Sequence, residues 1–183
     1  MILKTKLFGH VYEFKSIREV MAKANEEKSG DKLAGIAAET AEERVAAKVV
    51  LSNLTLNDLR NCPAVPYEED EVTRIIQDSV NETIFNEYKN MTVAEFREWL
   101  LDTQTTPDMI RRASRGLTSE IVAGVCKLMS NLDLIYAAKK MRVTAHCNTT
   151  IGLPGTFSSR LQPNHTTDDP KGIIASVMEG LSL

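Results

Sequence analysis

Two polar side chains near the end of the sequence have the types and spacing to hold a small polar substrate. Arg160 and Gln162 lie in the segment 156–162, whose pattern predicts a short strand that ends before Pro163. Side chains two apart on a strand leave the same face, so we expect the pair to project together. A guanidinium is a fixed fork of donors, and a carboxamide adds a donor and an acceptor, which suits a substrate oxygen. A surface arginine and an edge-strand glutamine would account for the same spacing.

The elements around this pair predict a β/α architecture. A polar loop follows the predicted strand, and a helical pattern begins at Pro170. Strand, loop and helix make one β/α unit, and such folds bind ligands at the carboxyl ends of their strands. We therefore predict that residues 148–183 contain one β/α unit. Because a barrel of eight such units needs about 250 residues, we expect the chain to be the front of something longer.

The residues before that unit predict a β-hairpin and many short helices. Period-two alternation on both sides of Gly9-His10 predicts a hairpin. From Ser16 the period becomes helical, and patterns of Ser or Thr with Glu three residues later predict capping boxes at Ser16, Thr40 and Thr92. Residues 16–141 predict roughly six to eight helices in total.

The predicted fold is mainly α with an N-terminal β-hairpin, divided into two domains. Residues 1–147 form the hairpin and helical extension, and residues 148–183 form the β/α unit. The most apolar segment, 119–141, predicts a central helix with a break near Ser130-Asn131, and Phe96, Trp99 and Leu100 are predicted to be core residues or a helix–helix contact.

Composition limits the classes of protein that the chain can represent. It has 183 residues, a formal net charge of −3, 43% hydrophobic and 26% charged residues, which is typical of an ordinary globular protein. The absence of a basic excess argues against a nucleic-acid binder. No signal-peptide pattern or apolar run long enough for a membrane span is found. Three widely separated cysteines predict a reducing, cytosolic compartment rather than a disulfide framework.

Metal binding and phosphate binding have weak support in the sequence. His10, His146 and His165 do not stand at metal-ligand spacing with one another, so no metal site is predicted. The segment 152–156 superficially looks like a phosphate loop, but it lacks the Gly-Lys-Ser/Thr ending and contains Pro154. We predict a turn there and assign no catalytic residue to the chain.

Four runs of sequence carry a resemblance to a known family. They are LAGIAA at 33–38, ERVAAK at 43–48, GLTSE at 116–120 and, above all, NTTIGLPGTFSSRLQPN at 148–164. The chain resembles the N-terminal portion of the large, catalytic subunit of ethanolamine ammonia-lyase from the hairpin to its last residue. In that family the Arg and Gln of an Arg-Leu-Gln-Pro motif contact the substrate, which implies substrate-binding roles for Arg160 and Gln162.

The resemblance implies an activity, a cofactor and partners. The family converts ethanolamine to acetaldehyde and ammonia by adenosylcobalamin radical chemistry in a TIM barrel that follows a hairpin-and-helices extension. The resemblance thus implies that residues 148–183 are the first β/α unit of a truncated (β/α)8 TIM barrel. It is bacterial and cytoplasmic, works with the ethanolamine utilisation microcompartment, and assembles from several large and small subunits. The cofactor contacts and the carboxylates for the substrate amine come from later barrel strands, so we expect the 183-residue chain alone to be inactive.

A second interpretation belongs to another class of protein. The helices would form a non-catalytic interaction module for oligomerisation or subunit docking, and the strand with Arg160 and Gln162 would be incidental. A small helical regulator is a third interpretation, supported by composition alone.

Overall fold

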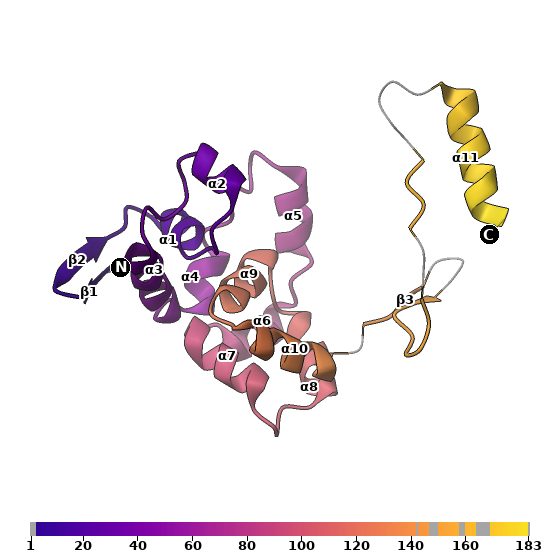
Figure 1. The fold of residues 1–183 in the computed structure, drawn as a ribbon. Coiled ribbons are helices and arrows are strands. Elements are labelled where there is room, and N and C mark those ends of the chain that lie inside the picture. The colour runs from indigo at the N-terminus through magenta and orange to yellow at the C-terminus, as the bar shows by residue number, and fades with distance from the viewer. Residues whose placement is uncertain (1–2, 142, 147–149, 158–159, 164–168, 183) are drawn as a thin grey trace. The chain divides into compact units, whose positions relative to one another are not determined.

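The chain forms two compact units in the computed structural model, Met1–Met141 and Arg142–Leu183 (Figure 1). The division into domains 1–147 and 148–183 stays a prediction. The structure describes residues 3–141, 143–146, 150–157, 160–163 and 169–182.

The first unit begins with the predicted β-hairpin. Strands β1 (Lys4–Leu7) and β2 (His10–Glu13) pair antiparallel, with Leu7 opposite His10. The two turn residues are Phe8 and Gly9, one position earlier than expected, and both have positive φ angles of 52° and 83°. Two-residue turns with positive φ at both positions match the twist of a hairpin, and glycine adopts such a φ without strain.

The remainder of the first unit is helical, as the capping pattern predicts, but its helices are shorter and more numerous than expected. The first helix ends at Lys23, and Ser29, which we expected near its end, instead begins the next one. Within residues 3–141 the helices are α1 (Ile17–Lys23), α2 (Ser29–Leu33), α3 (Ala41–Ser52), α4 (Leu56–Arg60), α5 (Glu71–Asp78), α6 (Glu82–Tyr88), α7 (Val93–Leu101), α8 (Pro107–Ser114), α9 (Ser119–Lys127) and α10 (Asn131–Lys140).

The predicted cap residues begin their helices. At Thr92 the capping box is complete, because its Oγ1 accepts from the Glu95 amide at 3.1 Å and the Glu95 carboxylate accepts from the Thr92 amide at 2.7 Å. At Ser16 and Thr40 the hydroxyl also caps the helix, but the glutamate reaches the amide of the residue before the cap. A cap of this kind stabilises a helix by about 1 kcal/mol.

The predicted break near Ser130 is confirmed, because α9 ends at Lys127 and α10 begins at Asn131. The first turn of α10 also contacts α7. Asp133 completes a capping box with Ser130, whose amide lies 2.9 Å from the Asp133 carboxylate. Its carboxylate also accepts from the Arg97 guanidinium at 2.7 Å. Two hydrogen bonds hold the pKa of Asp133 below its ordinary value: the one from Arg97 has the larger effect, and the one from the Ser130 amide has a smaller effect.

A short backbone bridge joins the starts of α4 and α7. Thr55 and Thr92, the cap residues of these helices, face each other as an isolated antiparallel bridge. The Val93 amide donates to the Leu54 carbonyl at 2.8 Å, and a second amide–carbonyl bond of 3.0 Å connects the same two segments. Two turns from distant parts of the sequence therefore satisfy each other's backbone groups.

The core of the first unit lies where α3, α4, α7 and α9 meet. Five large apolar side chains from these four helices are almost completely buried, and each stabilises the fold by roughly 1.5–3 kcal/mol. The predicted packing of Phe96 and Trp99 is confirmed, with ring centroids 5.0 Å apart and Tyr88 edge-on to Phe96. The five side chains are Leu51, Leu56, Leu59, Val93 and Ile121.

The second unit differs from the predicted β/α unit at its strand. Strands β3 (Ala145–His146) and β4 (Thr150–Ile151) pair antiparallel, and the sequence patterns did not predict this pairing. In the segment 156–162, the described residues 156, 157 and 160–162 belong to no strand. A parallel strand needs neighbours for its backbone groups, and no neighbour for this segment is found among the described residues.

The predicted helix of the second unit is present. Helix α11 (Pro170–Ser182) begins at the expected proline. The segment 160–163 runs alongside it (Figure 1), and a Leu161 methyl lies 2.5 Å from the position that a Cβ would take on Gly180. The second unit therefore holds a helix and an extended segment in contact, although the segment is not paired as a strand.

We predict that Gly116→Ala destabilises the first unit. A Cβ at Gly116 would lie 2.8 Å from the Phe85 amide nitrogen, so the backbone of α6 would have to move. We expect the free energy of unfolding, measured by urea denaturation, to fall by about 1–3 kcal/mol. The matched control is Gly30→Ala in α2, where nothing lies within 4 Å. Equal denaturation midpoints for the two variants would contradict this close approach.

Candidate functional site

The predicted substrate-binding pair lies in the second unit, on the segment beside α11. Arg160 and Gln162 are both exposed, and Leu161 between them contacts the helix at Gly180. Leu161 is itself 45% exposed, and its contact with α11 is made by the end of its side chain against Gly180. The pair is thus available to a ligand, and Leu161 gives the segment one contact with α11.

Helix α11 is apolar on two sides. Ile173, Val177 and Gly180, at helical spacing, are half-buried within the second unit. A second stripe with the same spacing is exposed, with Ile174 at 62%, Met178 at 65% and Leu181 at 75%. A helix that is apolar beyond a single stripe is typical of one that is covered from more than one side.

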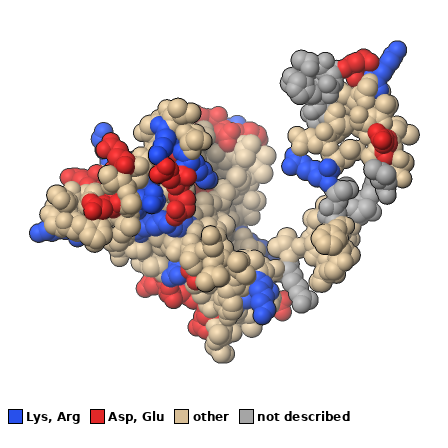
Figure 2. Space-filling model, viewed as in Figure 1, with Lys and Arg blue, Asp and Glu red and all other residues tan. Residues whose placement is uncertain are grey.

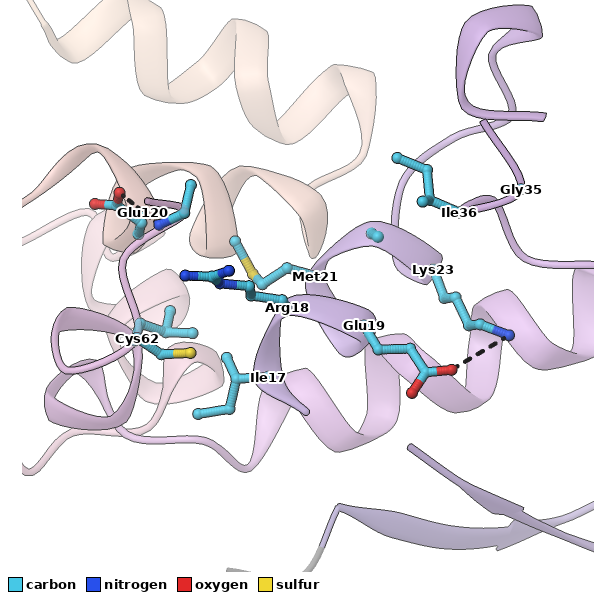
Figure 3. A pocket seen from close by; sticks show the side chains of 12 residues that line it. Ile17, Arg18, Glu19, Met21, Lys23, Gly35, Ile36, Cys62 and Glu120 are labelled. Atoms are coloured by element: carbon cyan, nitrogen blue, oxygen red, sulfur yellow. Dashed lines mark hydrogen bonds and ion pairs between the residues drawn. The ribbon is translucent and has the colours of Figure 1, made fainter. Parts of the chain in front are cut away.

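A pocket of about 460 Å³ opens in the first unit beside α1 (Figure 3). We call it the α1 pocket; its apolar wall includes Ile17, Met21 and Leu59, and the Cys62 thiol also lines it. The Arg18 side chain extends across it toward the segment that carries Cys62, where its Nε and Nη2 donate to the Pro63 carbonyl at 3.3 and 3.1 Å.

The charged side chains that line the α1 pocket are two cations and two anions, namely Arg18, Glu19, Lys23 and Glu120. Lys23 forms ion pairs with Glu43 and, at 3.7 Å, with Glu19. Burial by itself lowers the pKa of Lys23, but the hydrogen bond and charge of Glu43, with Glu19 and Glu39, raise it above its ordinary value. Figure 2 shows acidic and basic side chains next to one another over the visible face of this unit. The α1 pocket is therefore an apolar cavity with a neutralised rim, which suits binding rather than proton transfer.

Sequence patterns did not indicate the α1 pocket. Its walls come from α1, from Gly35 and Ile36, from the end of α4 and from Glu120 at the start of α9. Neither a motif nor a periodicity connects these segments, because only the packing of the helices brings them together. The pocket contains neither Arg160 nor Gln162.

Within the described ranges, we found no group of three or more His, Cys, Asp or Glu side chains arranged to hold a metal ion. None of the helices in those ranges has the length and apolar composition needed to span a membrane.

The chain is mainly helical and has an N-terminal hairpin. Comparison of its sequence with known proteins identifies its family. The chain belongs to the ethanolamine ammonia lyase large subunit (EutB) family, whose model matches residues 12–183. It is 59% identical over 182 residues to the ethanolamine ammonia-lyase large subunits of Escherichia coli K12 and Salmonella typhimurium. Those alignments cover 100% of the chain and 40% of each relative. The resemblance to the N-terminal portion of this subunit is thereby confirmed.

We predict that Arg18 limits access to the Cys62 thiol. In Arg18→Gln the bonds to the Pro63 carbonyl are lost, so the segment after α4 is held less tightly. Labelling of Cys62 by N-ethylmaleimide, followed by peptide mass spectrometry, should become several-fold faster. The exposed Cys126 on α9 is the internal control, and its rate should not change. Unchanged labelling of Cys62 would show that Arg18 does not hold this segment.

Proposed function

We propose that this chain is the part of an ethanolamine ammonia-lyase large subunit that supplies Arg160 and Gln162 to the substrate site. Membership of the family supports the activity, which belongs to the complete enzyme. The observation that carries the proposal is the placement of the pair, exposed on either side of a leucine that packs on α11. In the complete subunit, the segment 156–162 pairs as the first strand of a TIM barrel and α11 is the helix that follows it.

Arg160 and Gln162 have distinct roles in this proposal. The Arg160 guanidinium is a fixed fork of N–H donors, so it donates to the hydroxyl oxygen of ethanolamine and stabilises negative charge that develops there. Gln162 offers a donor and an acceptor at the same time, which fixes the orientation of the substrate. Both residues bind and orient, and neither is assigned a proton-transfer role.

The cofactor and the groups for the substrate amine are proposed to come from other parts of the enzyme. Adenosylcobalamin supplies the radical in the complete enzyme, but a corrin ring with its nucleotide loop and adenosyl group is larger than the α1 pocket of about 460 Å³. We assign no described residue to it and derive no step from it. A protonated amine needs carboxylate partners, which we place in later barrel strands together with the cofactor contacts.

The proposed partners and location follow the family. We propose that the large subunit assembles with the small subunit and with further large-subunit copies in the bacterial cytoplasm, within the ethanolamine utilisation microcompartment. One observation also favours the second interpretation, a helical interaction module. Leu132 and Ile135, one turn apart on α10, are 77% and 66% exposed. Such a surface suits subunit docking, and this role is compatible with substrate contacts from the second unit.

We predict that Arg160→Met in the full-length enzyme lowers kcat/KM for ethanolamine by at least about 100-fold. Removal of a charged donor that acts on a developing oxygen charge costs roughly 3 kcal/mol. Steady-state acetaldehyde release with the small subunit and adenosylcobalamin measures the effect. Arg115→Met, on an exposed arginine after α8, is the matched control and should retain normal kinetics. Normal kinetics in both variants would remove the proposed role of Arg160.

We predict that the 183-residue chain alone has no lyase activity. It carries the proposed hydroxyl contacts, whereas we place the carboxylate partners of the amine and the cofactor site in later strands. The measurement is acetaldehyde release by the purified chain with the small subunit, adenosylcobalamin and ethanolamine, beside the full-length large subunit as positive control. Turnover above the small-subunit background would contradict this assignment of the site.

A further inference from the structure

A second cavity in the first unit collects lysine side chains. It measures about 800 Å³ and is lined by residues of the segment after α1, of α3, and of the junction between α9 and α10. Three of its lining residues are Lys28, Lys48 and Lys127, which come from three different segments of the chain. We call it the lysine cavity. None of its lining residues belongs to the α1 pocket or to the predicted substrate site.

Lys127 and Lys48 are half-buried, whereas Lys28 is exposed. Lys127 lies at the end of α9, and its ammonium donates to the Asn25 side-chain oxygen. Burial, and then the neighbouring charge of Lys28, lower the pKa of Lys127, and Lys48 acts in the same direction. The negative charge of Asp31 raises the pKa of Lys127 and so acts in the opposite direction. The Asp31 carboxylate accepts a hydrogen bond of 3.4 Å from the Asn25 amide nitrogen.

The positive charge around the lysine cavity is only partly compensated. Lys48 pairs with Glu26 at 2.8 Å, and the Glu26 side chain is 75% exposed. Within residues 3–141, neither Lys28 nor Lys127 lies within ion-pair distance of a carboxylate. Like charges brought together without partners repel one another, and an anion in the cavity would relieve that repulsion.

The remaining walls indicate what kind of anion fits. Five lining side chains are apolar, so the cavity has an apolar part beside its cationic part. Ammonium groups act as point charges toward phosphate oxygens, and binding cavities usually combine apolar walls with a few convergent polar groups. The volume also exceeds what inorganic phosphate alone would fill. The apolar residues are Ala24, Ala123, Leu128, Met129 and Leu134.

We propose that the lysine cavity binds a small organic phosphate, with the phosphate between Lys28, Lys48 and Lys127 and the apolar body against α9 and α10. This site shares no residue with the proposed ethanolamine site, and the proposal does not depend on that site. Asn25, which also lines the cavity, accepts a hydrogen bond from the Lys127 ammonium and so restrains it. Glu26 pairs with one of the three lysines, so the site keeps a net positive charge.

Pyridoxal 5′-phosphate is a suitable probe, because it carries a phosphate on an aromatic body and an aldehyde that reacts with lysine. The aldehyde and a neutral amine condense to an imine with loss of water, and borohydride reduces the imine to a stable adduct. Peptide mass spectrometry of the full-length protein then locates and quantifies each adduct. Lys139, which is exposed on α10, is the control for labelling that depends on exposure alone.

We expect Lys127 to be labelled at lower probe concentrations than Lys139, although it is less exposed. Inorganic pyrophosphate should protect Lys127, whereas sodium chloride at equal ionic strength should not. Lys48→Gln should raise the probe concentration needed for half-maximal labelling of Lys127 about tenfold, which is the loss of affinity expected for one charge-assisted contact. Circular dichroism checks that the variant is folded. Labelling that simply follows exposure, or that pyrophosphate does not reduce in the unaltered protein, would overturn the proposal.

Discussion

Backbone groups must find hydrogen-bond partners, and this constraint determines how the two units differ. A helix satisfies most of its own amides and carbonyls, whereas a strand depends on a neighbouring strand. The first unit is built almost entirely of helices and has a well-buried core. In the second unit, α11 is formed, but the segment 160–163 beside it is not a strand. The proposed substrate pair lies on this segment, so its final geometry depends on neighbours that the described residues do not include.

Short helices depend on caps and tertiary contacts at their ends, and the first unit provides both. Helices of five to twelve residues are marginal in isolation, so caps and tertiary contacts must hold them. The bridge between Thr55 and Thr92 joins two capped helix starts, and Asp133 serves both its own cap and Arg97. The cavities of this unit are by-products of such packing, because they form where segments distant in sequence meet. The α1 pocket has a neutralised rim, whereas the lysine cavity retains positive charge.

Features that depend on a few adjacent residues could be predicted from the sequence. The caps at Thr92 and Thr40, the proline start of α11 and the break at Ser130 are local, and the structure confirms them. The turn of the hairpin was misplaced by one residue because a positive φ at Phe8 is unusual for a residue other than glycine. Neither the two cavities nor the pairing of β3 with β4 has a local signal. The predicted strand at 156–162 had the right pattern, but pattern alone does not supply a partner strand.

The central claim is that Arg160 and Gln162 bind the hydroxyl group of ethanolamine side by side once the barrel is complete. A crystal structure of the full-length large subunit with the small subunit and ethanolamine tests it most directly. The account predicts a paired first strand at 156–162, with the Arg160 guanidinium and the Gln162 amide both at about 3 Å from the substrate. It is contradicted if the two side chains lie on opposite faces of the strand, or if other residues hold the hydroxyl oxygen.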